Sequence, residues 1–271
     1  MAILIGFDDT PYGQDALALG LQIAARDGEP VTVVTVFPDD ERGLLVAVQD
    51  SAWVAQVRGV AERKLETARH LVGDRQEVTF RTAGPGSASR GLHELAEELE
   101  PRLLVVGSSE HAAVGRISPG STVENLLHGS PCPVAVAPRG YRDHRSEIQC
   151  IAVAYDATPE ADRALDFAIE AAQRREATLR LVAVAARASA ELQAELDAAA
   201  ARVPEGVKTT AEVITARDVV KTLADLPGDR PDVLVCGSRG YGAVRQVLLG
   251  SVSNRLVRNA AYPVVVVPRE A

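Results

Sequence analysis

Glycine and hydroxyl residues recur at fixed spacing near the end of the chain. In GSRGYGAVRQVLLGSVSN, Gly237 and Gly240 are followed, after nine further residues, by Gly250 and Ser251. Glycine permits positive φ angles and close approach of the backbone to a ligand. The apolar run DVLVCG predicts a strand that ends at Gly237. Ser251 opens an expected helix, whose first N–H groups are unpaired donors that bind anions, phosphates above all. The alternative is a tight turn followed by a helix that Ser251 simply caps.

Two other phosphate-binding patterns fit less well. The segment GRISPGST, residues 115–122, imitates a Walker A loop but has Ser121 where that loop needs a lysine. The segment GYGAVR lacks the third glycine of a dinucleotide-binding fingerprint. The wider glycine spacing is therefore the pattern that needs an explanation.

This pattern lies in the second copy of an internal repeat. Residues 107–139 align without gaps on residues 237–269, with 12 of 33 positions identical. Upstream, ILIGFDDTPYGQDAL matches IAVAYDATPEADRAL and pairs Asp8 with Asp156. The chain is therefore a duplication.

The first copy is the longer one. The offset between the copies falls from 148 at their first landmark to 130 at their last, a difference of 18 residues. Most of this excess lies between Phe37 and Val78, in a stretch that contains Trp53 and has apolar residues at helical spacing toward its end. We expect a longer loop and helix there.

Short apolar runs alternate with helical patterns in both copies. This order predicts parallel sheets with helices on both faces. The expected fold is α/β: two tandem Rossmann-like sandwiches, each with a mostly parallel five-stranded sheet. We expect domains at residues 1–140 and 147–271, joined by the charged segment RGYRDHRSEI. Thr10 and Thr158, each followed by a proline, predict helix starts.

The last apolar run of each copy predicts how the halves meet. The runs PVAVAP, residues 133–138, and PVVVVP, residues 263–268, are apolar on both faces. An exposed edge strand is normally blunted by charge or by a bulge. We therefore expect these two strands to lie at the interface between the halves.

Composition limits the partners. The chain has a net charge of −8, no block of basic residues and few aromatic residues. These features argue against nucleic acid or a membrane surface as a partner. The start lacks a basic region, and no apolar stretch approaches the ~20 residues that a membrane helix needs, so we expect a cytoplasmic protein. The three cysteines lack CxxC spacing and are expected to be buried thiols rather than zinc ligands or disulfides.

With this glycine pattern, and an aspartate after the first strand, the chain resembles the universal stress protein family over essentially its whole length, twice. The resemblance implies an intrachain pseudo-dimer that binds ATP, with or without Mg²⁺, and acts in stress response as a regulatory or signalling protein. It places Asp156 at the ribose or adenine and Val184 at the adenine pocket. The remaining nucleotide-binding residues that it implies are Gly237, Gly240, Gly250, Ser251, Val252 and Ser253.

The first copy departs from the pattern at one position. Glu110 stands where the second copy has Gly240, and a carboxylate beside a polyphosphate adds bulk and like-charge repulsion. We expect this degenerate site not to bind ATP; the alternative is that Glu110 points into solvent and the pocket survives. The residues of the degenerate site are Asp8, Val36, Gly107, Glu110, Gly120 and Ser121.

Catalysis is not indicated by the sequence. All five histidines belong to the first copy or to the junction, and neither a nucleophile–base–acid set nor a metal-ligand cluster is visible from spacing. Three functions stay open: an ATP-binding regulator, an interaction scaffold that binds no nucleotide, and a weak ATPase. The protein partner is unknown, and a homodimer is a further option.

Overall fold

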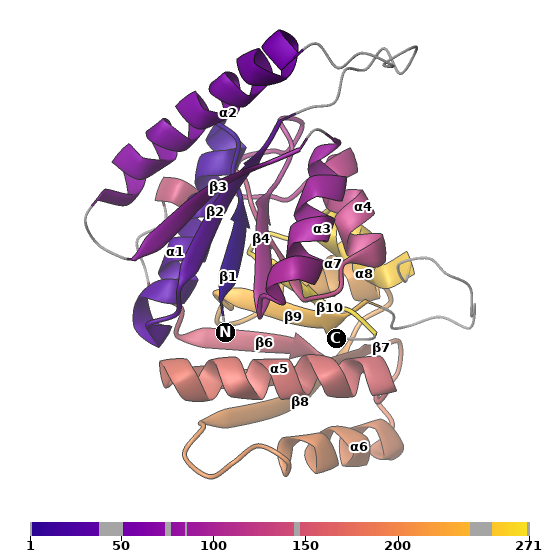
Figure 1. The fold of residues 1–271 in the computed structure, drawn as a ribbon. Helices are drawn as coiled ribbons and strands as arrows, with labels where there is room; N and C mark the ends of the chain where they lie inside the picture. The colour runs from indigo at the N-terminus through magenta and orange to yellow at the C-terminus, as the bar shows by residue number, and fades with distance from the viewer. Residues whose placement is uncertain are drawn as a thin grey trace.

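The computed structural model describes residues 2–37, 51–73, 77–84, 86–143, 147–238 and 251–269. The chain alternates strands and helices throughout (Figure 1). In the first half the elements are β1 (Ile3–Gly6), α1 (Pro11–Asp27), β2 (Val31–Val36), α2 (Ser51–Val72), β3 (Val78–Ala83), α3 (Ala88–Leu99), β4 (Leu103–Gly107), α4 (Ser121–Gly129) and β5 (Val134–Ala137). In the second half they are β6 (Cys150–Ala154), α5 (Pro159–Arg175), β7 (Thr178–Ala185), α6 (Ala190–Ala200), β8 (Thr209–Thr215), α7 (Val219–Ala224), β9 (Val233–Gly237), α8 (Ser251–Val257) and β10 (Val264–Val267).

The strands form one ten-stranded sheet in the order β3-β2-β1-β4-β5-β10-β9-β6-β7-β8. Within each half the paired strands are parallel, as the alternating pattern predicts. The halves meet where β5 and β10 pair antiparallel, with Val265 opposite Ala135. The predicted interface strands are thereby confirmed.

Helices cover both faces of the sheet and bury two apolar layers. On one face α1, α2, α5 and α6 pack over a core that includes Leu17, Leu65, Leu165 and Leu196. On the other face α3, α4, α7 and α8 pack over a core that includes Leu92, Leu126, Leu223 and Leu256. The expected α/β class, with two Rossmann-like units, is confirmed.

Local signals explain where the helices start. Thr10 caps α1 by accepting a hydrogen bond from the N–H of Gly13, and Thr158 caps α5 by accepting one from the N–H of Ala161, each at 3.2 Å. The proline after each threonine lacks an N–H that would be unpaired there in any case. Both predicted starts are confirmed.

The longer helix expected in the first half is α2, with 22 residues, whereas its counterpart α6 has 11. The loop expected before it, residues 38–50, and the side chain of Trp53 lie outside what the structure describes. Part of the extra length therefore appears as about three additional turns of helix on the outer edge of the first half (Figure 1).

Part of the junction between the halves packs against α1. Asp15 of α1 is completely buried and accepts hydrogen bonds from the N–H groups of Gly140 and Arg142, at 2.8 and 2.9 Å. Tyr141, in a short 3₁₀ turn, donates to Gln22 at 2.5 Å. Residues 140–142 of the segment that its charged composition predicts to be a linker are therefore docked on α1.

Candidate functional site

The carboxyl ends of neighbouring strands bring the predicted residues of the second half to one edge of the sheet. Asp156 follows β6, Val184 lies next to the end of β7, and Gly237 ends β9. Because β7, β6 and β9 are adjacent and parallel, these ends share an edge. Gly240 and Gly250 lie outside the described residues.

A tight turn positions Asp156. Its carboxylate accepts a hydrogen bond from the hydroxyl of Thr158 at 2.6 Å, so the residue that caps α5 also orients the carboxylate. Between them, Ala157 has a φ of 57°, a left-handed conformation uncommon for residues other than glycine. The turn therefore fixes a half-buried carboxylate at the edge of the sheet.

Gly237 is the point where three elements meet. A Cβ atom there would lie 2.8 Å from the carbonyl oxygen of Glu160 in the first turn of α5, so only glycine fits without a shift. The buried Ser253 of α8 donates its hydroxyl to the carbonyl oxygen of Gly237 at 2.8 Å. Ser253 therefore holds α8 on β9, and its oxygen keeps accepting capacity.

The remaining predicted residues of the second half differ in exposure. Val184 is buried in the core beneath this edge, and Val252 in the first turn of α8 is half-buried. Ser251 opens α8, as expected. Burial raises the pKa of the neighbouring Cys236 thiol to about 12, which keeps it neutral.

The first half repeats the same framework. Asp8 follows β1, Val36 ends β2 and Gly107 ends β4, and these strands are also adjacent and parallel. A Cβ atom on Gly107 would lie 2.0 Å from the carbonyl oxygen of Tyr12, which matches the approach of α5 to Gly237. The two halves thus share the geometry that demands glycine at the end of the fourth strand.

The loop after β4 in the first half is closed on itself. The N–H of Ser109 donates to the carbonyl oxygen of Ser118 at 2.8 Å, and the N–H of Ser118 donates to the hydroxyl of Ser108 at 2.7 Å. Arg139 donates to the carbonyl oxygens of Glu110 and Ala112, at 3.2 and 2.8 Å. These bonds fix the conformation of the loop.

The Glu110 side chain points outward. It is 70% exposed, and its carboxylate lies 3.8 Å from the imidazole of His111. Gly120 precedes α4, and Ser121 is the first residue of that helix. The geometry therefore agrees with the alternative in which Glu110 faces solvent.

Two residues of α2, which the sequence analysis did not single out, contact the carboxylates after β1. The ammonium group of Lys64 forms an ion pair with Asp8, and the hydroxyl of Thr67 donates to Asp9 at 3.1 Å. Helical spacing places Lys64 and Thr67 on one face of α2. The spacing does not predict that this face contacts the residues after β1, because they lie more than 50 residues earlier in the chain.

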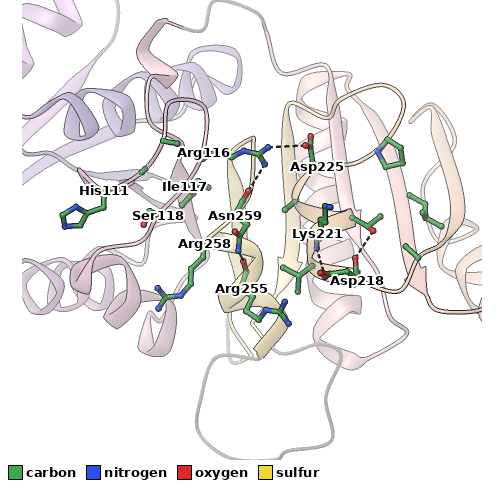
Figure 2. A pocket seen from close by; sticks show the side chains of 18 residues that line it. His111, Arg116, Ile117, Ser118, Asp218, Lys221, Asp225, Arg255, Arg258 and Asn259 are labelled. Carbon is green, nitrogen blue, oxygen red and sulfur yellow. Dashed lines mark hydrogen bonds and ion pairs between the residues drawn. The ribbon is translucent and has the colours of Figure 1, made fainter.

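A cleft of about 1010 Å³ lies beside α8, between the two halves (Figure 2). Arg116, from the loop after β4, donates to the carbonyl oxygen of Asn259 at 2.9 Å and pairs with Asp225 at 3.3 Å across the cleft. Lys221 of α7 and Arg255 of α8 also line it. The predicted nucleotide-site residues that the structure describes are not among its lining residues.

Neither a metal-binding cluster nor a membrane-spanning helix is present in the described part of the chain. No group of three or more histidine, cysteine, aspartate or glutamate side chains there has a geometry that could hold a metal ion. Within the same residues, none of the helices has the length and apolarity that crossing a bilayer requires. Cys132 and Cys236 are buried free thiols as expected, whereas Cys150 is half-buried.

The fold, together with the sheet edge that carries Asp156 and Gly237, defines a tandem α/β protein whose two Rossmann-like halves join through their last strands. The chain belongs to the universal stress protein family, which it matches over residues 1–138, 147–229 and 185–268.

Known proteins similar to it span nearly its whole length. A universal stress protein of Mycobacterium tuberculosis is 28% identical over an alignment 292 residues long, covering 99% of this chain and 100% of the relative. One from Mycolicibacterium smegmatis is 26% identical, covering 98% and 96%. The crystal structure of a universal stress protein from Archaeoglobus fulgidus shares the fold with a TM-score of 0.71 at 20% identity, covering 99% of this chain and 96% of that one.

Proposed function

We propose that the second half of this protein binds one adenine nucleotide, with ATP as the ligand, and that the bound nucleotide regulates the protein in a stress response. The observation that carries the proposal is the convergence of Asp156, Gly237 and the start of α8 at one edge of the sheet. Ligands of open α/β sheets bind at the carboxyl ends of the strands. The glycine spacing of the following loop supplies the phosphate-binding pattern.

Each described residue has a role that its chemistry supports. The carboxylate of Asp156 accepts hydrogen bonds and is suited to ribose hydroxyls or the adenine amino group. Val184 forms the apolar wall beneath the nucleoside. The N–H groups that open α8 face the phosphates, where the helix dipole favours negative charge. Gly240 and Gly250 permit close approach of the loop, and Mg²⁺ bound to the phosphates would need few protein ligands.

We assign the nucleotide a regulatory role. The second half contains no histidine, so a common general base is missing from its sequence. The alternatives are a scaffold that binds no nucleotide and a weak ATPase; release of inorganic phosphate during incubation with ATP would favour the latter.

Calorimetric titration with ATP tests the proposal. The wild-type chain should bind with a stoichiometry near one, and Asp156→Ala should strongly weaken binding because it removes the carboxylate proposed to accept hydrogen bonds from the nucleoside. Asp197→Ala is the matched control, because Asp197 is an exposed aspartate on α6. Wild-type affinity in Asp156→Ala would contradict the proposed site.

A further inference from the structure

The cleft beside α8 is built by both halves and carries more positive than negative charge. Its walls come from the loop after β4 in the first half, and from the end of β8 and the segments around α7 and α8 in the second (Figure 2). Four cationic side chains and two carboxylates line it: Arg116, Lys221, Arg255, Arg258, Asp218 and Asp225. The whole chain has a net charge of −8, so the cleft is opposite in sign to the chain as a whole.

Two of the four cations join the halves. Arg116 of the first half pairs with Asp225 of the second at 3.3 Å. Arg258 of the second half forms an ion pair with Glu124 on α4 of the first. These two pairs run in opposite directions across the boundary between the halves, so they hold together the segments that form the cleft.

The pair between Arg116 and Asp225 deprives Lys221 of the carboxylate that helical spacing offers it. Lys221 and Asp225 are four residues apart at the end of α7, a spacing at which opposite charges on a helix pair. In α3, the third helix of the first half, Arg90 and Glu94 have this spacing and pair at 2.8 Å. Asp225 pairs with Arg116 instead. Within the described ranges, the exposed Lys221 is therefore left without an ionic partner.

Arg255 is the second such cation. It is an exposed residue of α8, and none of the ion pairs among the described residues includes it. The carbonyl oxygen of Arg255 accepts from the side-chain amide of Asn259 at 2.7 Å, which fixes the end of the helix. Lys221 and Arg255 thus present two cations from neighbouring helices to one cleft.

The base of the cleft is apolar. Ile117, Val220 and Ala224 line it although they are almost fully buried, so they lie at its bottom. Ile214, near the end of β8, is half-buried and lines it as well. A ligand that complements this cleft therefore carries negative charge together with an apolar group.

We infer that this cleft binds an acidic segment of a partner protein, whose carboxylates pair with Lys221 and Arg255 while an apolar side chain of the segment rests on the base. Charge complementarity carries the assignment. The acidic chain as a whole repels such a segment, so the cationic cleft determines where it binds. A compact inorganic anion would leave the apolar base and most of a volume of about 1010 Å³ unfilled. The inference is separate from nucleotide binding, because the described residues of the predicted nucleotide site do not line the cleft.

Fluorescence anisotropy with fluorescein-labelled polyglutamate, on the intact chain without nucleotide, tests the inference. The wild-type protein should bind the probe saturably at low salt. Lys221→Gln and Arg255→Gln should each weaken binding by about threefold, and the double variant by about tenfold, because each removes one exposed ion pair. Lys208→Gln is the matched control: Lys208 is an exposed lysine outside the cleft, and its replacement should leave the affinity unchanged.

Three results would overturn the inference. The first is the absence of saturable binding to the wild-type protein. The second is equal affinity in the double variant and in Lys208→Gln, with circular dichroism showing that both are folded. The third is displacement of polyglutamate by inorganic pyrophosphate at the same concentration of negative charge, which would assign the cleft to a compact anion. The stoichiometry of ATP binding does not depend on these outcomes, so the inference and the proposed function fail separately.

Discussion

At the scale of single residues, Thr158 links folding to the site. Its hydroxyl accepts from the N–H of Ala161 as the cap of α5 and donates to Asp156 at 2.6 Å. Thr10 caps α1 with the same geometry in the first half. Both threonines therefore cap a helix, but only Thr158 lies beside the proposed nucleotide site.

Thr158→Ala and Thr10→Ala should each lower the free energy of unfolding by about 1 kcal/mol through loss of a helix cap. Thr158→Ala should also weaken ATP binding by about fivefold, because a lost hydrogen bond of about 1 kcal/mol no longer orients the carboxylate of Asp156. Urea denaturation and calorimetry measure the two effects. Equal ATP affinity in both variants would show that Asp156 does not contact the ligand.

At the scale of elements, strong local sequence signals were sufficient to predict much of the fold. The start of α5 at Pro159 follows from Thr158 and its proline, and the repeat predicts the matching strands of both halves. The pairing of β5 with β10 was predictable because both strands are apolar on both faces. The contact between Lys64 and Asp8 was not, because it depends on how α2 packs after a long insertion.

Replacing Val265 and Val267 of β10 with lysine should separate or unfold the halves. Both side chains are buried in one apolar layer, and burying two unpaired charges should cost about 4 kcal/mol or more. Thermal denaturation and small-angle scattering measure the loss of stability and compactness. Val114→Lys is the control, since Val114 is exposed and its replacement should change stability by about 0.5 kcal/mol at most. A wild-type melting curve for the double variant would show that these two side chains of β10 do not stabilise the contact between the halves.

At the scale of the whole molecule, a buried ionic cluster fastens the halves on the face covered by α1 and α5. Glu29 accepts from Arg102 of its own half at 2.6 Å and from Arg174 of the second half at 2.8 Å. Glu29 and Arg102 are almost fully buried, so the carboxylate compensates a guanidinium group removed from water. The sequence could not reveal this cluster, because its members are separated by 73 and 145 residues.

Glu29→Ala should lower the free energy of unfolding by about 3 kcal/mol, because it removes the counter-ion of a buried arginine. Glu147→Ala is the comparison: Glu147 forms an exposed ion pair with Arg26, and its loss should cost about 1 kcal/mol at most. Chemical denaturation of both variants gives the difference. Equal stability losses would mean that the Glu29 cluster contributes no more than a surface pair.

The central claim is that one nucleotide is bound per chain although the framework is present twice. Native mass spectrometry of the wild-type protein, titrated with ATP, measures it most directly. We predict that the protein peak shifts by the mass of one nucleotide per chain and that the shift saturates there. A saturating shift of two nucleotides would contradict the expectation that the first half does not bind ATP, and no shift at any concentration would contradict nucleotide binding by this protein.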